Sequence, residues 1–285
     1  MNNKLKNLAI RTASGAVLAA VLFGATLLSP LGYMALLLII AVVGVWEFYK
    51  LAEISGYHPQ RVMGLALSVV LFAFGASIFY SMVIARSEVA ESLILAAILY
   101  ALVAVPSVFV CELFRNKEHS IANVATTLAG VLYVALPTVL MLAVPQMING
   151  GEWSPWCAIC YILTIWANDS FAYLVGVGIG RHRMCERISP KKSWEGFVGG
   201  VVAAVGFGAL WGHLLGHNVL VWAGLGAIIA VTGVAGDFVE SLFKRTAGVK
   251  DSGAILPGHG GMLDRFDALF ISAPYVVLYL IIVGM

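Results

Sequence analysis

The sequence predicts an all-α polytopic integral membrane protein with about nine transmembrane helices. The 285 residues are 61% hydrophobic and only 11% charged, with a mean hydropathy of +0.94. Two stretches, 12–46 and 196–236, contain no Lys, Arg, Asp or Glu. Each is long enough to cross twice a hydrocarbon core that needs about 17 to 25 apolar residues per helix. This composition excludes the class of soluble globular domains.

Turn-forming or polar segments separate the expected spans. The turn Ser29-Pro30-Leu31-Gly32 divides the first long apolar run, and polar residues between 213 and 218 divide the second. Lys4, Lys6 and Arg11 precede the first run, which lacks a small-residue cleavage site, so we interpret it as an uncleaved span. The expected spans are approximately 14–28, 32–49, 62–83, 92–111, 122–143, 155–178, 197–213, 218–236 and 268–284.

Lysine and arginine predict the orientation of these spans. With the N-terminus on the cytoplasmic side, the inner loops are 1–13, 50–61, 112–121, 179–196 and 237–267. They contain all of the 17 Lys and Arg residues except Arg86. Because positive charge concentrates on the cytoplasmic side of membrane proteins, we expect the N-terminus inside and the C-terminus outside.

Neither the overall charge nor the cysteines indicate a particular function. A net charge of +2 does not favour a nucleic-acid partner. The Cys157–Cys160 pair lies in an apolar helical run without a second pair. Small polarisable core residues are therefore a simpler interpretation than a redox or metal pair.

The first polar cluster, Asn168-Asp169, lies within the expected sixth span. An ionisable residue inside a membrane is costly and by default suggests a functional site. The alternative is a hydrogen bond between helices.

The second cluster follows that span and includes Ser189 and the dipeptide Lys191-Lys192. Its cations satisfy the positive-inside pattern by themselves. A hydroxyl, backbone N–H groups and two ammonium groups at the entrance to a helix can also bind a phosphate chain. Lys191 and Lys192 are therefore candidates for binding an anion.

The third cluster, the stretch from Asp237 to Asp267, is the most highly charged part of the chain. It contains carboxylates that hard cations such as Mg²⁺ prefer, and glycines at which the backbone can approach a ligand closely. Asp264 and Asp267 are three residues apart and would share one face of a helix. A loop whose charges neutralise one another is the alternative. The charged residues are Asp237, Glu240, Lys244, Arg245, Lys250, Asp251, Asp264, Arg265 and Asp267.

Within this stretch the runs SLFKR (241–245) and LPGHGGMLDRFD (256–267) flank Lys250-Asp251. This pattern resembles the signature of the phosphatidate cytidylyltransferases, or CDP-diacylglycerol synthases. The segments around Asn168-Asp169 and SPKKSWEG (189–196) are also similar to that family. The motif-bearing resemblance covers roughly 160–285. We therefore divide the chain into N-terminal spans (1–150, about five) and a catalytic region (151–285) with charged loops 179–196 and 237–267.

The resemblance implies transfer of the cytidylyl group of CTP to phosphatidic acid. From the distribution of Lys and Arg we expect this site on the cytoplasmic side of the cell membrane. It implies Mg²⁺ as cofactor, leaving open whether a monovalent cation shares the site and whether the protein is a homodimer. The implied metal ligands are Asp237, Asp264 and Asp267. The implied catalytic residues are Asp237, Asp264, Asp251, Lys250, His259 and Arg265. His259 would either donate a proton or, as we favour, only form hydrogen bonds within its loop. The implied substrate-binding residues are Asn168, Asp169, Ser189, Lys191, Lys192, Lys244, Arg245, Gly260 and Gly261.

Two other functions fit parts of the sequence. A CDP-alcohol phosphotransferase is also a polytopic enzyme of nucleotide-activated lipid, but its D-G-x-x-A-R opening is absent. A cation-coupled transporter could use Asp169 and Asp237 as ion sites, although transporters place such residues near the bilayer midplane between broken helices. Release of pyrophosphate from CTP in the presence of phosphatidic acid distinguishes the three.

Overall fold

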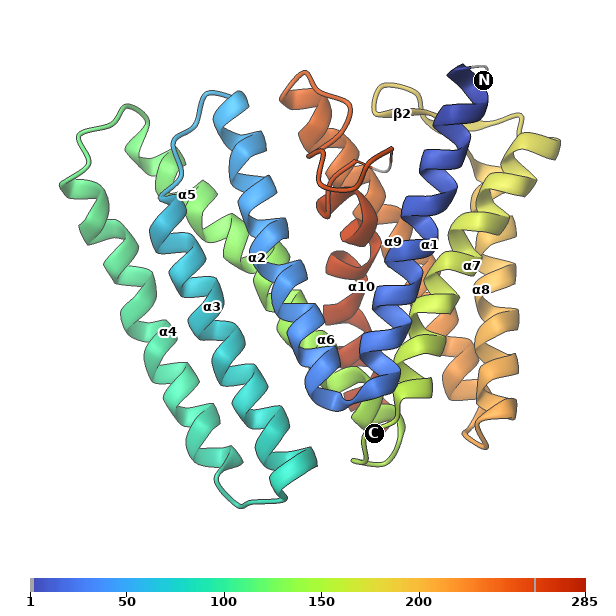
Figure 1. The fold of residues 1–285 in the computed structure, drawn as a ribbon, viewed down its shortest axis with the longest axis horizontal. Helices are drawn as coiled ribbons and strands as arrows, with labels where there is room; N and C mark the ends of the chain where they lie inside the picture. The colour runs from blue at the N-terminus through green and yellow to red at the C-terminus, as the bar shows by residue number, and fades with distance from the viewer. Residues whose placement is uncertain (1–2, 259) are drawn as a thin grey trace. The chain divides into compact units, whose positions relative to one another are not determined.

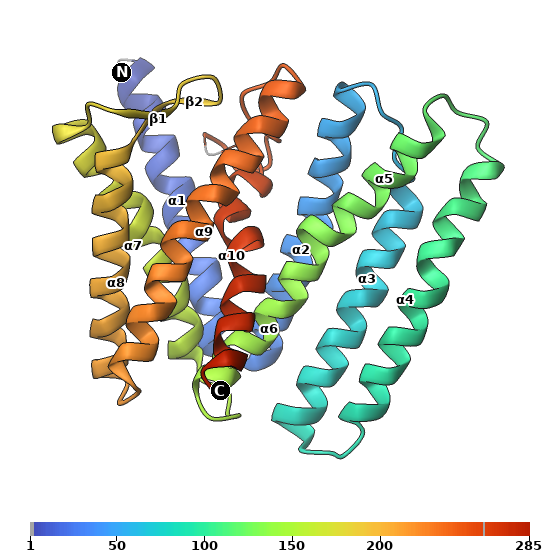
Figure 2. The same cartoon turned by 180° about the vertical axis from the view of Figure 1, so that it is seen from behind.

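The computed structural model describes residues 3–258 and 260–285, except for the side chains of 3–11. The described chain consists of long helices and one two-stranded β-hairpin (Figures 1 and 2). Contacts between residues divide it into two compact units. Unit 1 contains residues 1–143 and 246–265, and unit 2 contains residues 144–245 and 266–285.

Unit 1 is built from the N-terminal helices and the loop before the last helix. The π-helical segment η1 continues α3, and η2 joins α5 to α6. We call the segment between α9 and α10 the 247–262 loop. The elements are α1 (Asn3–Leu28), α2 (Pro30–Ile54), α3 (Arg61–Phe79), η1 (Tyr80–Ala85), α4 (Ala90–Leu113), α5 (Ser120–Gly130), η2 (Val131–Ala135) and α6 (Leu136–Ile148), whose end belongs to unit 2.

Unit 2 contains the hairpin and most of the later helices. Strands β1 and β2 pair antiparallel in the connection between α7 and α8. The elements are α7 (Pro155–Ile179), β1 (Arg183–Cys185), β2 (Ser189–Ser193), α8 (Trp194–Leu214), α9 (Val219–Thr246) and α10 (Leu263–Ile282), whose first residues belong to unit 1.

The predicted fold class is confirmed: eight described helices are long and apolar enough to cross a membrane. The first expected span lies in α1, whose fully described part, Thr12–Leu28, is a shorter apolar helix. Helix α9 continues to Thr246, ten residues beyond the expected end of the eighth span at residue 236. No Gly or Pro interrupts 237–246, and Gly248 with φ +68° follows the helix end. The hairpin was not predicted from the sequence.

Helix α2 is anchored in unit 1 by a buried tyrosine. The Tyr49 hydroxyl donates a 2.7 Å hydrogen bond to the backbone carbonyl of Thr127 on α5. Glycines make room for the ring: a Cβ added at Gly64 would lie 1.9 Å from the Tyr49 hydroxyl oxygen, and one at Gly130 would lie 2.4 Å from a ring carbon. A methyl group at either glycine would therefore force the helices apart.

The close pairing of α7 and α8 in unit 2 depends on glycine in the same way. A Cβ added at Gly196 would lie 2.6 Å from the carbonyl oxygen of Ala172. One turn further along α8, a Cβ at Gly200 would lie 2.6 Å from Asn168 Oδ1. Small residues let membrane helices approach closely, and these two glycines do so between α7 and α8.

A buried carboxylate joins three segments of unit 1. Glu112, at the end of α4, is 6% exposed. Its side-chain oxygens accept hydrogen bonds from Gln60 Nε2 (2.7 Å) and Asn123 Nδ2 (3.0 Å). Arg115 Nη1 donates a third bond of 2.7 Å. Glu112 therefore connects the segment before α3, the end of α4 and the first turn of α5.

We expect Glu112→Ala to lower the free energy of unfolding by about 3 kcal/mol, because it leaves buried donors and a cation without their acceptor. Equilibrium denaturation in mixed micelles measures this change. The control is Glu91→Ala on the same helix, whose side chain is exposed and whose effect should stay within about 0.5 kcal/mol. Equal effects of the two substitutions would contradict the structural role of Glu112.

Candidate functional site

Three carboxylates of unit 2 meet where α9 and α10 pack together. Each of Asp237, Glu240 and Asp267 offers an oxygen atom, and these three atoms lie within 4.8 Å of one another. Glu240 is 1% exposed and Asp267 is 9% exposed. Gly236 lets the helices approach, since a Cβ there would lie 2.5 Å from the carbonyl oxygen of Asp267. We call these three residues the acidic cluster.

Two lysines form ion pairs with two of the three carboxylates of the acidic cluster. Lys192 on β2 forms an ion pair with Asp237, and Lys244 pairs with Glu240 one turn earlier on α9. The Lys192 ammonium also lies 4.6 Å from the centre of the Phe238 ring, a favourable position for a cation. Opposite charges at i and i+4 on a helix attract. The structure thus brings together Lys192 and Asp237, which the sequence assigned to different roles.

The hairpin positions the basic residues that precede α8. Arg183 Nη1 donates a 3.1 Å hydrogen bond to the carbonyl oxygen of Lys191. Ser193 caps α8, because its Oγ accepts a 3.1 Å bond from Gly196 N. Strand β2 leaves the Lys191 side chain exposed and that of Lys192 half-buried. Ser189, at the start of the strand, is also half-buried.

Asn168 and Asp169 lie on α7 and have different surroundings. Asn168 is 1% exposed, and its Oδ1 is buried without a hydrogen-bond partner among the described residues. Its Nδ2 donates a 3.2 Å bond to Asp169 Oδ1. The Asp169 side chain is exposed and lies within electrostatic range of Asp267. Asp169 therefore adds a fourth negative charge near the acidic cluster.

In unit 1, the 247–262 loop encloses the carboxylate of Asp264. Asp264 Oδ2 accepts hydrogen bonds from Ser252 N (2.9 Å), Ser252 Oγ (2.8 Å) and Gly261 N (2.7 Å). Gly260 has φ +85°, and a Cβ there would lie 2.6 Å from the same oxygen. Thus Gly260 and Gly261 allow the backbone to approach a carboxylate of the protein itself. Whether they also bind substrate stays a prediction.

The two aspartates of α10 have different neighbours. The sequence predicted that Asp264 and Asp267 share a helix, and both lie in α10. Asp264 is bonded to the 247–262 loop of unit 1, whereas Asp267 belongs to the acidic cluster of unit 2. Their joint action on one metal ion stays a prediction.

The other predicted site residues lie at the surface or outside the described part. The side chains of Arg245, Lys250, Asp251 and Arg265 are exposed. His259 lies outside the described residues.

The site residues that we predicted from the sequence do not include Glu240 and Ser252. The spacing of Glu240 and Lys244 was an available signal for an ion pair, but it required the helix to continue past Asp237. Nothing local in the sequence marks Ser252 as a partner of Asp264, because twelve residues separate them.

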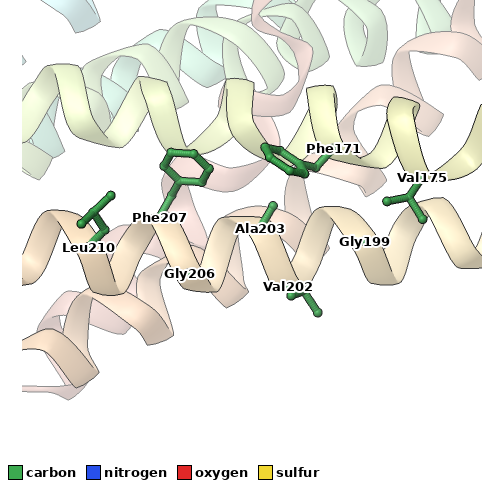
Figure 3. Close-up of a pocket in the computed structure, with 8 residues that line it drawn as sticks. All are labelled: Phe171, Val175, Gly199, Val202, Ala203, Gly206, Phe207 and Leu210. Atoms are coloured by element: carbon green, nitrogen blue, oxygen red, sulfur yellow. The ribbon is translucent and has the colours of Figure 1, made fainter.

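A shallow apolar groove of about 470 Å³ runs between α7 and α8 (Figure 3). Its lining has no ionisable group, so it can hold a hydrocarbon chain but supplies no acid–base chemistry. Phe171 lies two residues beyond Asp169 on the same helix. The lining residues are Phe171, Val175, Gly199, Val202, Ala203, Gly206, Phe207 and Leu210.

The donor set of the acidic cluster fits a divalent cation such as Mg²⁺. Mg²⁺ prefers oxygen ligands at 2.0–2.1 Å, and three carboxylate oxygens within 4.8 Å of one another can reach such distances with small side-chain shifts. The ammonium groups of Lys192 and Lys244 already place two positive charges against the cluster. The three carboxylates are therefore suited in charge and in atom type to a dication once these ammonium groups pair with other anions.

Comparison with known proteins agrees with these features. The model of the cytidylyltransferase family matches residues 9–283. A phosphatidate cytidylyltransferase of Staphylococcus haemolyticus is 30% identical over 267 residues, which are 93% of this chain and 94% of that protein.

Two further relatives with the same name match over a shorter region. That of Mycobacterium bovis is 41% identical over 144 residues (50% of this chain, 45% of the relative), and that of Staphylococcus aureus is 45% identical over 121 residues (42% and 46%). In these alignments the chain spans less than half of each relative's length. Because the family model covers nearly all of the sequence, the chain belongs to the cytidylyltransferase family.

Proposed function

We propose that the protein transfers the cytidylyl group of CTP to phosphatidic acid, giving CDP-diacylglycerol and pyrophosphate for phospholipid synthesis. An oxygen of the lipid phosphate forms a bond to the α-phosphorus of CTP. The bond from that phosphorus to the oxygen bridging to the β-phosphate breaks, and pyrophosphate leaves with the electron pair. The attacking phosphate has no hydroxyl proton that must be removed, so the reaction needs no strong base.

One observation carries this proposal: the acidic cluster and its two lysines lie together in a chain of the cytidylyltransferase family. Both reactants are polyanions, so the main task of the site is to bring them together and neutralise their charge. Three carboxylates beside exchangeable ammonium groups suit that task. The name of these relatives, phosphatidate cytidylyltransferase, supports phosphatidic acid as the acceptor.

Asp237, Glu240 and Asp267 would hold Mg²⁺, and Asp264 is the further ligand predicted from the sequence. When bound, the ion neutralises phosphate oxygens and stabilises the leaving group. Lys192 and Lys244 exchange their carboxylate partners for phosphate oxygens of CTP.

Other predicted residues contribute at the edges of the site. Lys191 and Arg245 bind the outer phosphates, while Ser189 and Asn168 supply polar contacts and Asp169 adds to the cation-binding charge. We also propose catalytic roles for three residues near the start of α10 and in the preceding loop, as predicted from the sequence: Lys250, Asp251 and Arg265.

The active site faces the cytoplasm in this proposal, and the N-terminus lies on the same side of the cell membrane. The support is the distribution of Lys and Arg, which lie in the expected inner loops with the exception of Arg86. CTP is a cytoplasmic metabolite, so the charged groups would meet it directly. The lipid substrate reaches the site from the bilayer that surrounds the apolar helices.

A reconstitution assay tests the proposed function. Purified protein in lipid vesicles receives CTP, Mg²⁺ and phosphatidic acid, and both pyrophosphate and CDP-diacylglycerol are measured. We expect both products in equal amounts, and neither when diacylglycerol replaces phosphatidic acid. Absence of both products from folded protein would reject cytidylyl transfer.

We expect Asp237→Asn and Asp267→Asn each to lower kcat at least about 100-fold, because each removes a charge from the acidic cluster. The shape of each side chain is retained, so the thermal unfolding midpoint in detergent should change little. Glu91→Gln, an exposed carboxylate on α4, is the matched control and should keep full activity. Normal turnover in either Asn variant at ordinary Mg²⁺ would contradict the assignment.

Cysteine labelling tests the proposed orientation. Ile255 in the 247–262 loop is 51% exposed, and Glu88 lies in an exposed connection between η1 and α4. In a background without native cysteines, Ile255→Cys should react with an impermeant maleimide only from the cytoplasmic side. Glu88→Cys should react only from the opposite side. The reverse pattern would refute the orientation.

A further inference from the structure

Helix α2 carries a buried carboxylate that is not among the predicted site residues. Glu47 is 1% exposed and lies within a helix that is long and apolar enough to cross a membrane. An ionisable group in such a segment is costly unless hydrogen bonds satisfy it. Its Oε1 has no hydrogen-bond partner among the described residues. The residue therefore needs an explanation beyond packing.

Glu47 Oε2 reaches the start of α10. It accepts a 2.8 Å hydrogen bond from the backbone N–H of Leu263, the first residue of that helix. The N–H groups of a first helical turn lack partners within the helix, and a negative charge there is favourable. Glu47 thus caps a helix that begins 216 residues later in the sequence.

The same oxygen is 3.4 Å from Ser252 Oγ, which also lies 2.8 Å from Asp264 Oδ2. A serine hydroxyl has one proton, so the shorter distance favours donation to Asp264. Ser252 therefore lies between the two carboxylates. Glu47 therefore influences the position of the Ser252 hydroxyl, which donates a hydrogen bond to Asp264.

The 247–262 loop closes around Glu47 by means of two glycines. A Cβ added at Gly253 would lie 2.2 Å from Glu47 Oε1, and its three nearest neighbours are all atoms of Glu47. A Cβ added at Gly261 would lie 2.5 Å from Glu47 Oε2. The backbone of the loop is thus fitted to this one side chain.

We propose that Glu47 is a positioning residue that fixes the 247–262 loop and thereby orients the Asp264 carboxylate. The proposal deepens the proposed function, on which its kinetic part rests. Glu47 acts through Ser252 and the N-terminus of α10, and it makes no contact with the reacting atoms. Its predicted effect is local to the loop.

Loop opening is measured without any substrate. Met262 is 8% exposed, so Met262→Cys in a background without native cysteines should react slowly with a soluble maleimide. We expect Glu47→Gln to speed this labelling on the order of tenfold, because the loop opens more often when its anchor is weakened. Val134→Cys, at a site 0% exposed in η2, reports global unfolding and should not change.

A matched control is Glu53→Gln on the same helix. Glu53 forms an ion pair with Arg61, and among the described residues it has no hydrogen bond or ion pair to the 247–262 loop. It should leave labelling at Met262→Cys unchanged. Equal labelling of Met262→Cys with and without Glu47 would overturn the proposal, and faster labelling of Val134→Cys as well would reduce Glu47 to a general structural role.

The kinetic readout uses the reconstituted full-length protein. Glu47→Ala should lower kcat/KM for CTP about 100-fold, since small displacements of positioned groups have effects of this size. KM for CTP should rise, whereas mere loss of folded protein would lower the apparent kcat and leave KM unchanged. An unchanged KM would contradict the positioning role. If the wild type shows no cytidylyl transfer, the proposed function fails while the labelling result still decides the role of Glu47.

A double-mutant cycle with Gly253 gives the sharpest test. Gly253→Ala should speed labelling at Met262→Cys on the order of tenfold, because its methyl group collides with Glu47. In the Glu47→Ala background the same substitution should have less than about a threefold effect, since the colliding side chain is gone. Independent, multiplicative effects of the two substitutions would refute the contact and with it the proposal.

Discussion

The structure depends on how a chain with few charges satisfies carboxylates that it buries among apolar helices. An unpaired charge in a medium of low dielectric constant costs several kcal/mol. Glu240 is paired with Lys244, and Glu112 accepts bonds from three side chains. Glu47 lies against backbone N–H and hydroxyl groups. Each solution fixes a different part of the chain in place.

Two of these buried carboxylates lie close to the ends of helices. Helix α9 continues ten residues past the uncharged run, and the Glu240–Lys244 pair lies along one face of this extension. Helix α10 begins at Leu263, whose backbone N–H donates a hydrogen bond to the Glu47 carboxylate. Hydrophobicity sets which segments can cross a membrane, and the few charged residues set the boundaries at which the site is built.

The sequence was sufficient for the features that depend on local pattern. Apolar runs predicted the spans, and the density of charge between 237 and 267 identified the region that holds most of the candidate residues. The β-hairpin was missed because β2, Ser189–Ser193, contains two lysines and a proline in place of an alternating apolar pattern. Glu47 was missed because its partners are more than 200 residues away, and no local signal marks such a contact.

In the acidic cluster, residues that the sequence analysis expected to bind different ligands form ion pairs with one another. Lys192 was expected to bind phosphate and Asp237 to bind metal, yet the two form an ion pair. Lys244 and Glu240 are paired in the same way. A divalent cation and a polyphosphate carry charges of opposite sign, so their arrival together lets each pair separate without leaving a bare charge behind. The same four side chains can therefore neutralise one another before ligands bind. Once ligands are bound, the lysines would neutralise phosphate oxygens of the proposed substrates, and the carboxylates would neutralise the cation. On this account the ion pairs keep a highly charged site compatible with its apolar surroundings.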